Sequence, residues 1–441
     1  MTDTPVAAVV LAAGLGTRMR SALPKHFHPL LGRRMVDWVI LAARAAGADP
    51  LVVVCSPGGR EAFGGLRVAV QSPPRGTGDA VRAARDALAD FSGEVLVLSG
   101  DVPGLTGELL AALLVRHRDA ATAATVCSFE PRDAGSYGRI VRDREGELSG
   151  IVEAGDASPA ELELSEVNAG IYVFDSVRLW PALERLESRN AQGELYLTDT
   201  IGLLLGDGER VAVHRAPDAF EVEGVNTRAE LAAVTAGLRD RINRAHMLAG
   251  VTIIDPGSTW IHPEVTIAAD VTIHPFVVLE GSTRIDPDAE IRPHTVAVDA
   301  RIGTGATVGP FCYLRPGTVL EADSKAGTFV EIKNSRIGPR SKVPHLSYVG
   351  DTEVGEDTNI GAGAITANFA HQAGRPKGRT RIGNNVRTGI QNGLVAPVEL
   401  GDGAWTAAGS TITKDVPPGA LAVARARQEN KEGYAARHRD A

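Results

Sequence analysis

The hydrophobic pattern divides the chain into two stretches with different periods. Up to about residue 226, apolar runs at 6–11, 51–55 and 95–98 alternate with helical patterns over 35–46 and 79–88. Because these runs lack polar alternation, both faces of each strand are expected to be buried in a mostly parallel sheet covered by helices. Ligands bind such sheets beyond the carboxyl ends of the strands. The first stretch therefore predicts an α/β domain with a site at that edge.

After residue 250, small aliphatic or threonine residues recur at every sixth position. Two such series are Ile273, Leu279, Ile285 and Ile291, and Ile382, Thr388, Leu394, Leu400, Thr406 and Ile412. This period is typical of a parallel β-helix, in which each hexad forms one side of a three-sided coil and the aliphatic residue points inward. The period breaks between Thr366 and Ile382 for a polar loop that includes Lys377. Such a loop either reaches a ligand or a neighbour, or is a solvated surface excursion.

A third pattern connects these two stretches. Residues 227–246 carry apolar residues at helical spacing, which predicts an amphipathic connecting helix. A chain of 441 residues also exceeds the roughly 250 to 300 residues at which single cores stop growing. We expect an α/β domain over 1–226, a linker helix over 227–250 and a β-helix over 251–441.

Composition and charge narrow the partners of this chain. The net charge of −8 argues against a broad basic face, so nucleic acid is not an expected partner. Cys55, Cys127 and Cys312 are far apart, form an odd count and lack metal-ligand spacing, which favours a reducing cytoplasm. The apolar run at 6–13 is far shorter than the roughly 20 residues of a membrane-spanning helix. Small anions are therefore the expected partners, and no membrane association is expected.

A glycine-rich turn follows the first apolar run. Gly14 and Gly16 lack a Cβ, so their backbone N–H groups can approach a triphosphate, and Arg18 and Lys25 follow to neutralise its charge. The turn lacks both the Gly-Lys-Ser/Thr of a P-loop and the third glycine of a dinucleotide fingerprint. For the two glycines alone, an ordinary strand-to-helix turn is the simpler interpretation.

Further motifs place this turn in an ordered series. They are Leu23-Pro24-Lys25, Gln71, Gly76-Thr77-Gly78, Gly100-Asp101-Val102-Pro103, Tyr137-Gly138-Arg139, Ile151-Val152-Glu153, Asn168-Ala169-Gly170 and Val222-Glu223-Gly224-Val225-Asn226. With the hexad pattern, almost the whole chain resembles the family of bifunctional N-acetylglucosamine-1-phosphate uridylyltransferases/glucosamine-1-phosphate N-acetyltransferases. The resemblance implies a Rossmann-like nucleotidyltransferase domain followed by a left-handed parallel β-helix of hexapeptide repeats. It also implies a cytoplasmic homotrimer that uses Mg²⁺, UTP, amino-sugar phosphates and acetyl-coenzyme A to make UDP-N-acetylglucosamine for cell-envelope polymers.

The resemblance implies specific roles in the first domain. Asp101 and Asn226 would hold Mg²⁺, and Arg18 and Lys25 would stabilise the charge that develops on the phosphates. The residues implied to bind UTP or the sugar are Leu11, Gly14, Gln71, Gly76, Thr77, Gly138, Glu153, Asn168 and Asn226. Of these, Gln71 and Thr77 would read the uracil, and Gly138, Glu153 and Asn168 would hydrogen-bond the amino sugar. The chain departs from the family pattern at Asp79, where histidine is usual, and at Gly155, where a basic residue is common.

The resemblance implies a second set of roles in the β-helix. His345 would be the general base, oriented by Glu331. The residues implied to bind the amino-sugar phosphate are Arg315, Lys333, Tyr348 and Asn359. The residues implied to bind acetyl-coenzyme A are Ala362, Asn368, Phe369, Ile390, Ala408 and Arg425. Phe369 replaces a tyrosine of the family and Ile390 replaces a serine, so two hydroxyl groups are lost.

Two other interpretations stay open. In the first, the chain transfers only uridylyl groups and the β-helix serves assembly; the joint presence of His345, Lys333 and Arg315 argues against it. In the second, the chain is a catalytically silent regulatory or scaffold subunit of a sugar-nucleotide complex. The intact residues Arg18, Lys25, Asp101 and Asn226 argue against that interpretation.

Overall fold

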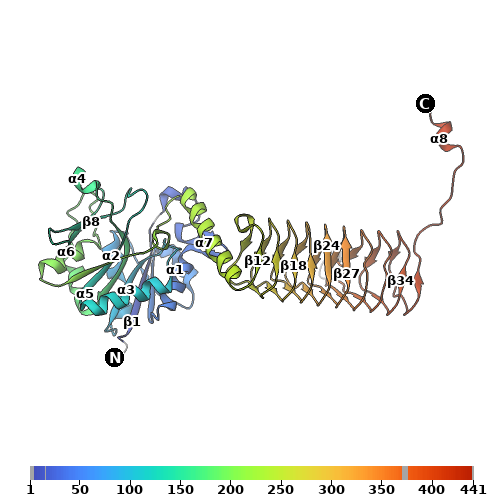
Figure 1. The fold of residues 1–441 in the computed structure, drawn as a ribbon, viewed down its shortest axis with the longest axis horizontal. Helices are drawn as coiled ribbons and strands as arrows, with labels where there is room; N and C mark the ends of the chain where they lie inside the picture. The colour runs from blue at the N-terminus through green and yellow to red at the C-terminus, as the bar shows by residue number, and fades with distance from the viewer. Residues whose placement is uncertain (1–3, 15, 370–375, 440–441) are drawn as a thin grey trace. The chain divides into compact units, whose positions relative to one another are not determined.

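The computed structural model describes residues 4–14, 16–369 and 376–439. The chain divides into two compact units, Met1–Leu238 and Arg239–Ala441. The division lies within helix α7 (Arg228–Leu248), which covers most of the connecting segment expected from the sequence (Figure 1). The three-part division expected from the sequence, at 1–226, 227–250 and 251–441, stays a prediction.

A mixed sheet forms the centre of the first unit. Its strands, in the order β11-β7-β10-β6-β1-β4-β5, are β11 (Val211–Arg215), β7 (Ala124–Phe129), β10 (Val167–Asp175), β6 (Glu94–Ser99), β1 (Val6–Ala12), β4 (Leu51–Cys55) and β5 (Arg67–Val70). All neighbours are parallel except β10, which runs antiparallel to β6 and β7. A hairpin of β8 (Arg139–Arg142) and β9 (Leu148–Val152) joins through β10, and β2 (Pro29–Leu30) pairs with β3 (Arg33–Arg34).

Helices cover both faces of this sheet. They are α1 (Met35–Ala45), α2 (Thr77–Ala83), α3 (Gly107–Ala120), α4 (Pro159–Leu162), α5 (Ser176–Glu184) and α6 (Asp199–Gly206). Along β1, Val6, Ala8 and Val10 pack with α1 and α3, while Ala7 and Val9 pack with α2, α5 and α6. Both faces of β1 are therefore buried, which confirms the prediction from its unbroken apolar run.

The second unit is a parallel β-helix whose coils contribute strands to three sheets. The first sheet contains β12 (Thr252–Ile253), β15 (Thr272–Ile273), β18 (Glu290–Ile291), β21 (Thr307–Val308), β24 (Lys325–Thr328) and β27 (Lys342–His345). The second contains β13 (Trp260–Ile261), β16 (Val278–Glu280), β19 (Val296–Val298), β22 (Tyr313–Leu314), β25 (Glu331–Lys333), β28 (Tyr348–Gly350), β30 (Ile365–Ala367), β32 (Gly393–Val395) and β35 (Thr411–Ile412). The third contains β14 (Thr266–Ile267), β17 (Arg284–Ile285), β20 (Arg301–Ile302), β23 (Val319–Leu320), β26 (Arg336–Ile337), β29 (Thr352–Val354), β31 (Thr380–Ile382) and β33 (Val398–Leu400). The pair β34 (Trp405–Thr406) and β36 (Leu421–Ala422) follows, and α8 (Tyr434–Arg437) lies near the end.

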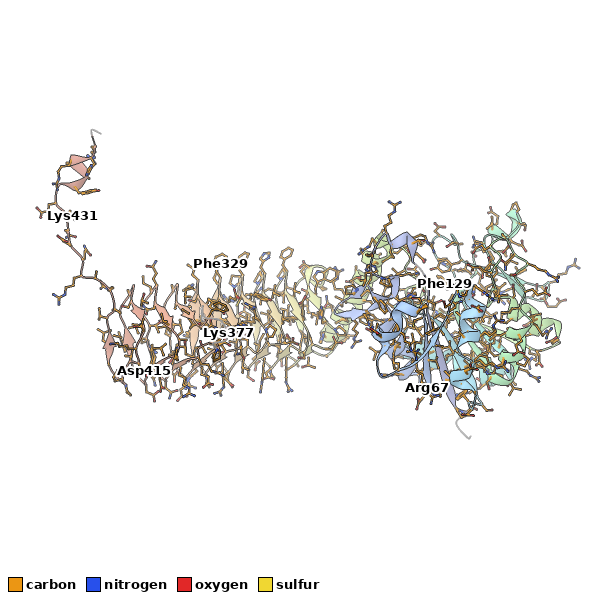
Figure 2. All side chains as sticks on the ribbon, turned by 180° about the vertical axis from the view of Figure 1, so that it is seen from behind. Arg67, Phe129, Phe329, Lys377, Asp415 and Lys431 are labelled. Atoms are coloured by element: carbon orange, nitrogen blue, oxygen red, sulfur yellow. The ribbon has the colours of Figure 1, made fainter. Side chains whose placement is uncertain are left out.

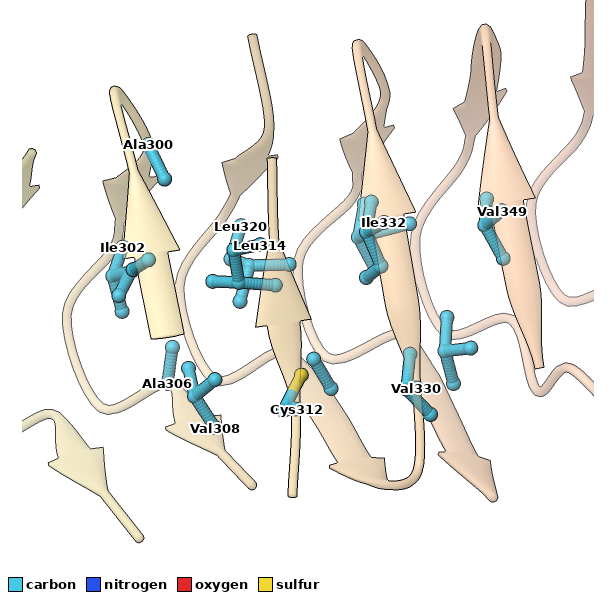
Figure 3. Close-up of a cluster of buried hydrophobic side chains, with 14 of the residues drawn as sticks. Ala300, Ile302, Ala306, Val308, Cys312, Leu314, Leu320, Val330, Ile332 and Val349 are labelled. Atoms are coloured by element: carbon cyan, nitrogen blue, oxygen red, sulfur yellow. The ribbon is translucent and has the colours of Figure 1, made fainter. Parts of the chain in front are cut away.

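The residues at every sixth position fill the inside of this β-helix. Ile302, Val308 and Leu314 belong to three different sheets, and all are fully buried (Figure 3). Burial of each such side chain contributes roughly 1.5 to 3 kcal/mol, so stacked coils share one continuous core. The hexad prediction is confirmed. The expected polar loop lies between β30 and β31, and its residues 370–375 are outside the described part of the chain.

Candidate active sites

Two adjoining cavities lie where the parallel strands of the first unit end. One has a volume of about 870 Å³ and the other of about 190 Å³. They share the lining residues Leu11, Thr77, Ser99, Asp101 and Asn226. The larger one is also lined by the glycine turn after β1 and by Gln71, Gly76, Arg18 and Lys25. The smaller one is also lined by Gly138, Glu153 and Asn168. The structure thus brings together every site residue that the sequence suggested for this domain.

Four charged or amide side chains meet between the two cavities. The Lys25 ammonium donates to Asp101 and, over 2.7 Å, to Asn226 Oδ1. Arg18 Nη2 donates to the same Asn226 oxygen over 3.0 Å. Burial alone would raise the pKa of Asp101, but the charges of Lys25 and His26 and the hydrogen bond from Lys25 outweigh it and lower that pKa. The Asp101 side chain is therefore held as a carboxylate beside the Lys25 ammonium.

The backbone of the glycine turn fits closely around Lys25. Gly16 adopts a φ of +60°, and a Cβ at this position would lie 2.4 Å from Lys25 Cβ. Leu15 of the same motif is outside the described residues. Gly16 is therefore required both for its left-handed backbone and for the approach of Lys25, a constraint that an ordinary strand-to-helix turn does not carry.

The larger cavity holds a polar network at its expected base-reading side. Gln71 Nε2 donates to the Gly76 carbonyl over 2.9 Å and to Asp79 Oδ2 over 3.0 Å. Asp79 also accepts from Arg82 over 2.7 Å. Asp79, which stands where the resembling family usually has histidine, thus fixes the Gln71 amide nitrogen toward its own carboxylate. The Gln71 amide oxygen then points the other way and can accept a hydrogen bond from a base N–H.

The smaller cavity contains a protected carboxyl group. Glu153 is largely buried, and this burial raises its pKa above the usual value. Its Oε1 accepts from the Thr198 hydroxyl over 2.9 Å. Asn168 lies at the start of β10 and donates to Tyr172 over 2.6 Å. Because β10 is antiparallel, its first residues lie at the edge where β6 ends, and this places Asn168 in the site.

Two residues of the first site were not assigned a role from the sequence. The His26 ring is buried below the glycine turn and lines the larger cavity, and burial lowers its pKa to about 4. Tyr137 Oη accepts from the Gly224 N–H over 3.0 Å and so fixes the loop that leads to Asn226. Tyr137 belongs to the Tyr137-Gly138-Arg139 motif but had no role assigned to it, and His26 was signalled only by its position directly after Lys25.

In the β-helix, several suggested residues form one column. The backbone N–H groups of Gly363, Gln391 and Gly409 donate to the carbonyls of His345, Ala362 and Ile390 over 3.3, 2.7 and 2.9 Å. Each of these donors directly follows a suggested residue, namely Ala362, Ile390 or Ala408, and the acceptor in the first coil is His345. The four residues therefore occupy the same corner position in successive coils. Neighbouring strands lie about 4.8 Å apart, so the column extends about 14 Å beyond His345. Arg425 lies near its far end, beside Gly409.

The other suggested residues lie on or beside the second sheet. Tyr348 is in register with Glu331, and Arg315 directly follows the strand next to that of Lys333. Glu331 Oε1 accepts from Arg315 over 2.9 Å, so Glu331 pairs with that guanidinium. Among the described residues, Glu331 makes no hydrogen bond to His345, so its expected role in orienting His345 stays a prediction. Asn359 bridges the backbones of Lys342 and Arg387.

A pair of cations marks one side of this surface. The positive charge of Lys377, from the polar loop, lowers the pKa of the nearby Lys333 ammonium. Two nearby ammonium groups repel each other, so an anion between them would be strongly favoured. Lys377 of the polar loop is thus close to the suggested site residue Lys333, which favours a loop that reaches a ligand.

Comparison with known proteins agrees with this geometry. Residues 8–199 match the model of the MobA-like NTP transferase domain. The chain is 46% identical to the bifunctional protein GlmU of Streptomyces coelicolor, over 99% of the chain and 95% of that protein. It is equally similar, with the same coverage, to the bifunctional protein GlmU of Corynebacterium efficiens, and 45% identical to that of Mycobacterium bovis over 98% of the chain and 92% of the protein. The chain belongs to the GlmU family.

Membership of the GlmU family confirms the resemblance inferred from the sequence, and the chain is a bifunctional enzyme with a nucleotidyltransferase domain. The interpretation as a silent scaffold is thereby excluded. The two replacements in the acetyl-coenzyme A set, Phe369 and Ile390, are both exposed. No helix in the described part of the chain is both long and apolar enough to cross a membrane.

Proposed function

We propose that the first site transfers the uridylyl group of UTP to N-acetylglucosamine-1-phosphate and releases pyrophosphate. The convergence of Lys25 and Arg18 on Asn226, between a larger and a smaller cavity, carries this proposal. The sugar phosphate would enter from the Glu153 side and attack the α-phosphorus, and the cations would stabilise the charge on the transferred and leaving phosphates. No protein nucleophile is needed, because positioning and electrostatics supply the catalysis.

The same residues fit a magnesium ion. An Asp101 carboxylate oxygen and the Asn226 amide oxygen already converge on one cation, the Lys25 ammonium. Hard oxygen ligands, few in number, suit Mg²⁺, which keeps several waters and binds substrate phosphates. We propose that Asp101 and Asn226 hold Mg²⁺, which when bound would neutralise phosphate charge.

Glu153 supports selection of the sugar. A largely buried carboxyl group that accepts one hydrogen bond from Thr198 has a free oxygen for a sugar hydroxyl or amide. A site that hydrogen-bonds a substrate group rejects analogues that lack this group. Gly138 lies against Glu153, where a Cβ would come within 3.3 Å of Oε2, so a side chain at this position would narrow the pocket beside the carboxyl group.

We propose that the second site transfers an acetyl group from acetyl-coenzyme A to the amine of glucosamine-1-phosphate. His345 would take the ammonium proton, the amine would attack the thioester carbonyl, and the coenzyme A thiolate would leave. The column from His345 to Ala408 supports a coenzyme that extends along the coils, and Lys333, Lys377 and Arg315 support capture of the sugar phosphate. This reaction would supply the substrate of the first site.

An exposed row of rings supports assembly of several copies. Phe276, His294, Phe311 and Phe329 stack with centroid separations of 4.8, 4.7 and 5.2 Å. Of these, Phe329 is labelled at the surface of the β-helix in Figure 2. An apolar row of this size on a surface is typical of a protein interface. Leu346 continues the row and directly follows His345, so a second copy on the row would border the second site. We propose a homotrimer, and expect Phe311→Ser to shift the sedimentation coefficient toward that of one chain.

A paired assay tests both reactions in one preparation. We would follow pyrophosphate release from UTP with N-acetylglucosamine-1-phosphate, and thiol release from acetyl-coenzyme A with glucosamine-1-phosphate. Both products are expected, and chelation of divalent ions should abolish pyrophosphate release while leaving thiol release unchanged. Pyrophosphate without thiol would contradict the acetyltransferase proposal and would favour a β-helix that serves assembly. We place the protein in the cytoplasm, since its three cysteines are unpaired.

A further inference from the structure

A buried carboxylate outside the suggested site residues links three successive coils. Asp351 is 7% exposed and has a φ of +50° at the corner after β28. Its Oδ1 accepts from Asn334 Nδ2 of the coil before over 2.5 Å, and its Oδ2 accepts from Asn368 Nδ2 of the coil after. Both carboxylate oxygens of Asp351 therefore accept a hydrogen bond from an amide nitrogen. An asparagine in this place could accept only one of these two bonds, because its other terminal atom is itself a donor.

The same corner closes the base of the polar loop. The loop leaves the β-helix at Asn368, whose carbonyl accepts from the Gly378 N–H over 3.0 Å. Where the chain returns, the Thr380 N–H donates to the Asp351 carbonyl over 3.2 Å. Asp351 thus holds both ends of the loop, through its side chain at the exit and through its backbone at the return.

Lys377 lies directly before the anchored Gly378, and its charge lowers the pKa of the nearby Lys333. Lys333 in turn directly precedes Asn334, which is the other donor to Asp351. The two cations consequently stand on the two segments that Asp351 joins. Because Lys377 is one residue from the hydrogen bond at Gly378, fixing this base also restricts where the Lys377 cation can lie.

We propose that Asp351 is a positioning residue of the second site, which fixes the loop so that Lys377 and Lys333 meet at the phosphate of the amino sugar. This inference rests on the acetyl transfer proposed above. Asp351 would act through its bonds to Asn334, Asn368 and the base of the loop, and its charge also acts on Lys333. Its effect should therefore appear in the binding of a phosphorylated sugar and not in proton transfer at His345.

Asp299 offers a matched control at the same corner. Asp299, Gly317, Asn334 and Asp351 follow one another in successive coils, and Asp299 has a φ of +46°. In the described part of the chain, its carboxylate accepts hydrogen bonds from the backbone N–H and the hydroxyl of Ser282, and the chain passes directly into the next coil without an inserted loop. The same substitution, aspartate to asparagine, can therefore be compared at two equivalent corners: Asp351, which holds the loop, and Asp299, which does not.

The experiment compares Asp351→Asn with Asp299→Asn in the full chain. Asp351→Asn places an amide nitrogen against a donor, so we expect the KM for glucosamine-1-phosphate to rise about tenfold, or about 1.4 kcal/mol. We expect kcat to change by less than about threefold, and the rate with glucosamine that lacks the phosphate to stay unchanged. Asp299→Asn should leave all three unchanged, and pyrophosphate release should stay at its wild-type rate in both variants.

A readout independent of catalysis completes the test. Difluorodinitrobenzene joins amines only a few ångströms apart, and it should join Lys333 to Lys377 in the wild-type chain and not in Asp351→Asn. If Asp351→Asn does not fold, Asp351→Gly replaces it, because Gly317 already occupies this corner two coils before. An unchanged KM and cross-link, or an equal effect of Asp299→Asn, would overturn the inference. Absence of thiol release in the wild-type chain would instead reject the proposed acetyl transfer.

Discussion

The two sites hold their positively charged side chains in different surroundings, one inside a cavity and the other on an open surface. In the α/β unit, the cations of the site are bonded within the chain, since Lys25 donates to Asp101 and Asn226 inside a cavity. On the β-helix, the cations Lys333 and Lys377 lie at the surface, and the suggested coenzyme residues form an open column. A sheet edge gathers loops into an enclosed pocket, whereas a solenoid repeats one position along a surface. The first site is therefore preorganised within one fold, and the second depends on what lies against its surface.

The largest expected effect tests whether the open site has a single proton acceptor. His345→Ala removes the proposed base, and we expect thiol release to fall by about 10²- to 10⁴-fold because general base catalysis contributes that much. Pyrophosphate release should stay within about twofold of wild type, since His345 lies in the other unit. The paired assay measures both rates in one preparation. An equal loss of both activities would mean that the two sites are coupled or wrongly assigned.

The reverse change tests the enclosed site. Asp101→Asn keeps the shape of the side chain and removes the charge that faces Lys25, so we expect pyrophosphate release to fall by about 10²- to 10³-fold. Thiol release should not change. Steady-state kinetics with varied Mg²⁺ give the second readout: the variant should require more Mg²⁺ than the wild-type chain. Activity that is insensitive to both the substitution and Mg²⁺ would reject Asp101 as a metal ligand.

The sequence predicted these two sites to different depths. In the first unit, the apolar runs located the strand ends, and every suggested residue reached the two cavities because parallel strands end at one edge. The antiparallel direction of β10, which brings in Asn168, had no sequence signal, because strand direction depends on the pairing partners. In the β-helix, the hexads predicted the core. Asp351 was missed because a turn aspartate in a repeat looks the same with or without a loop above it.

A smaller effect should come from the glycine turn. In Gly16→Ala the new methyl would lie 2.4 Å from Lys25 Cβ at a φ of +60°, so Lys25 must move away from Asn226. We expect pyrophosphate release to fall about tenfold, comparable to the loss of one hydrogen bond to a charged group. Gly47→Ala is the matched control, since Gly47 has a φ of +84° and no atom within 4 Å of a new Cβ. If both variants lose the same activity, backbone strain alone explains the loss.

The smallest expected effect concerns a histidine at the other end of the first sheet. His117 on α3 is buried, hydrogen-bonded to Thr125 over 3.0 Å, and burial lowers its pKa although Glu94 and Asp175 oppose this shift. Protons therefore bind the unfolded chain more tightly than the native one, so stability is complete above the unfolded pKa of about 6.5 and decreases as the pH falls below it. Hydrogen exchange of β7, corrected for the intrinsic rate, should be faster at pH 5.5 than at pH 7.5, and His117→Gln should weaken this difference. Exchange in β16 of the β-helix should not respond to the substitution; if it did, the two units would share one unfolding equilibrium.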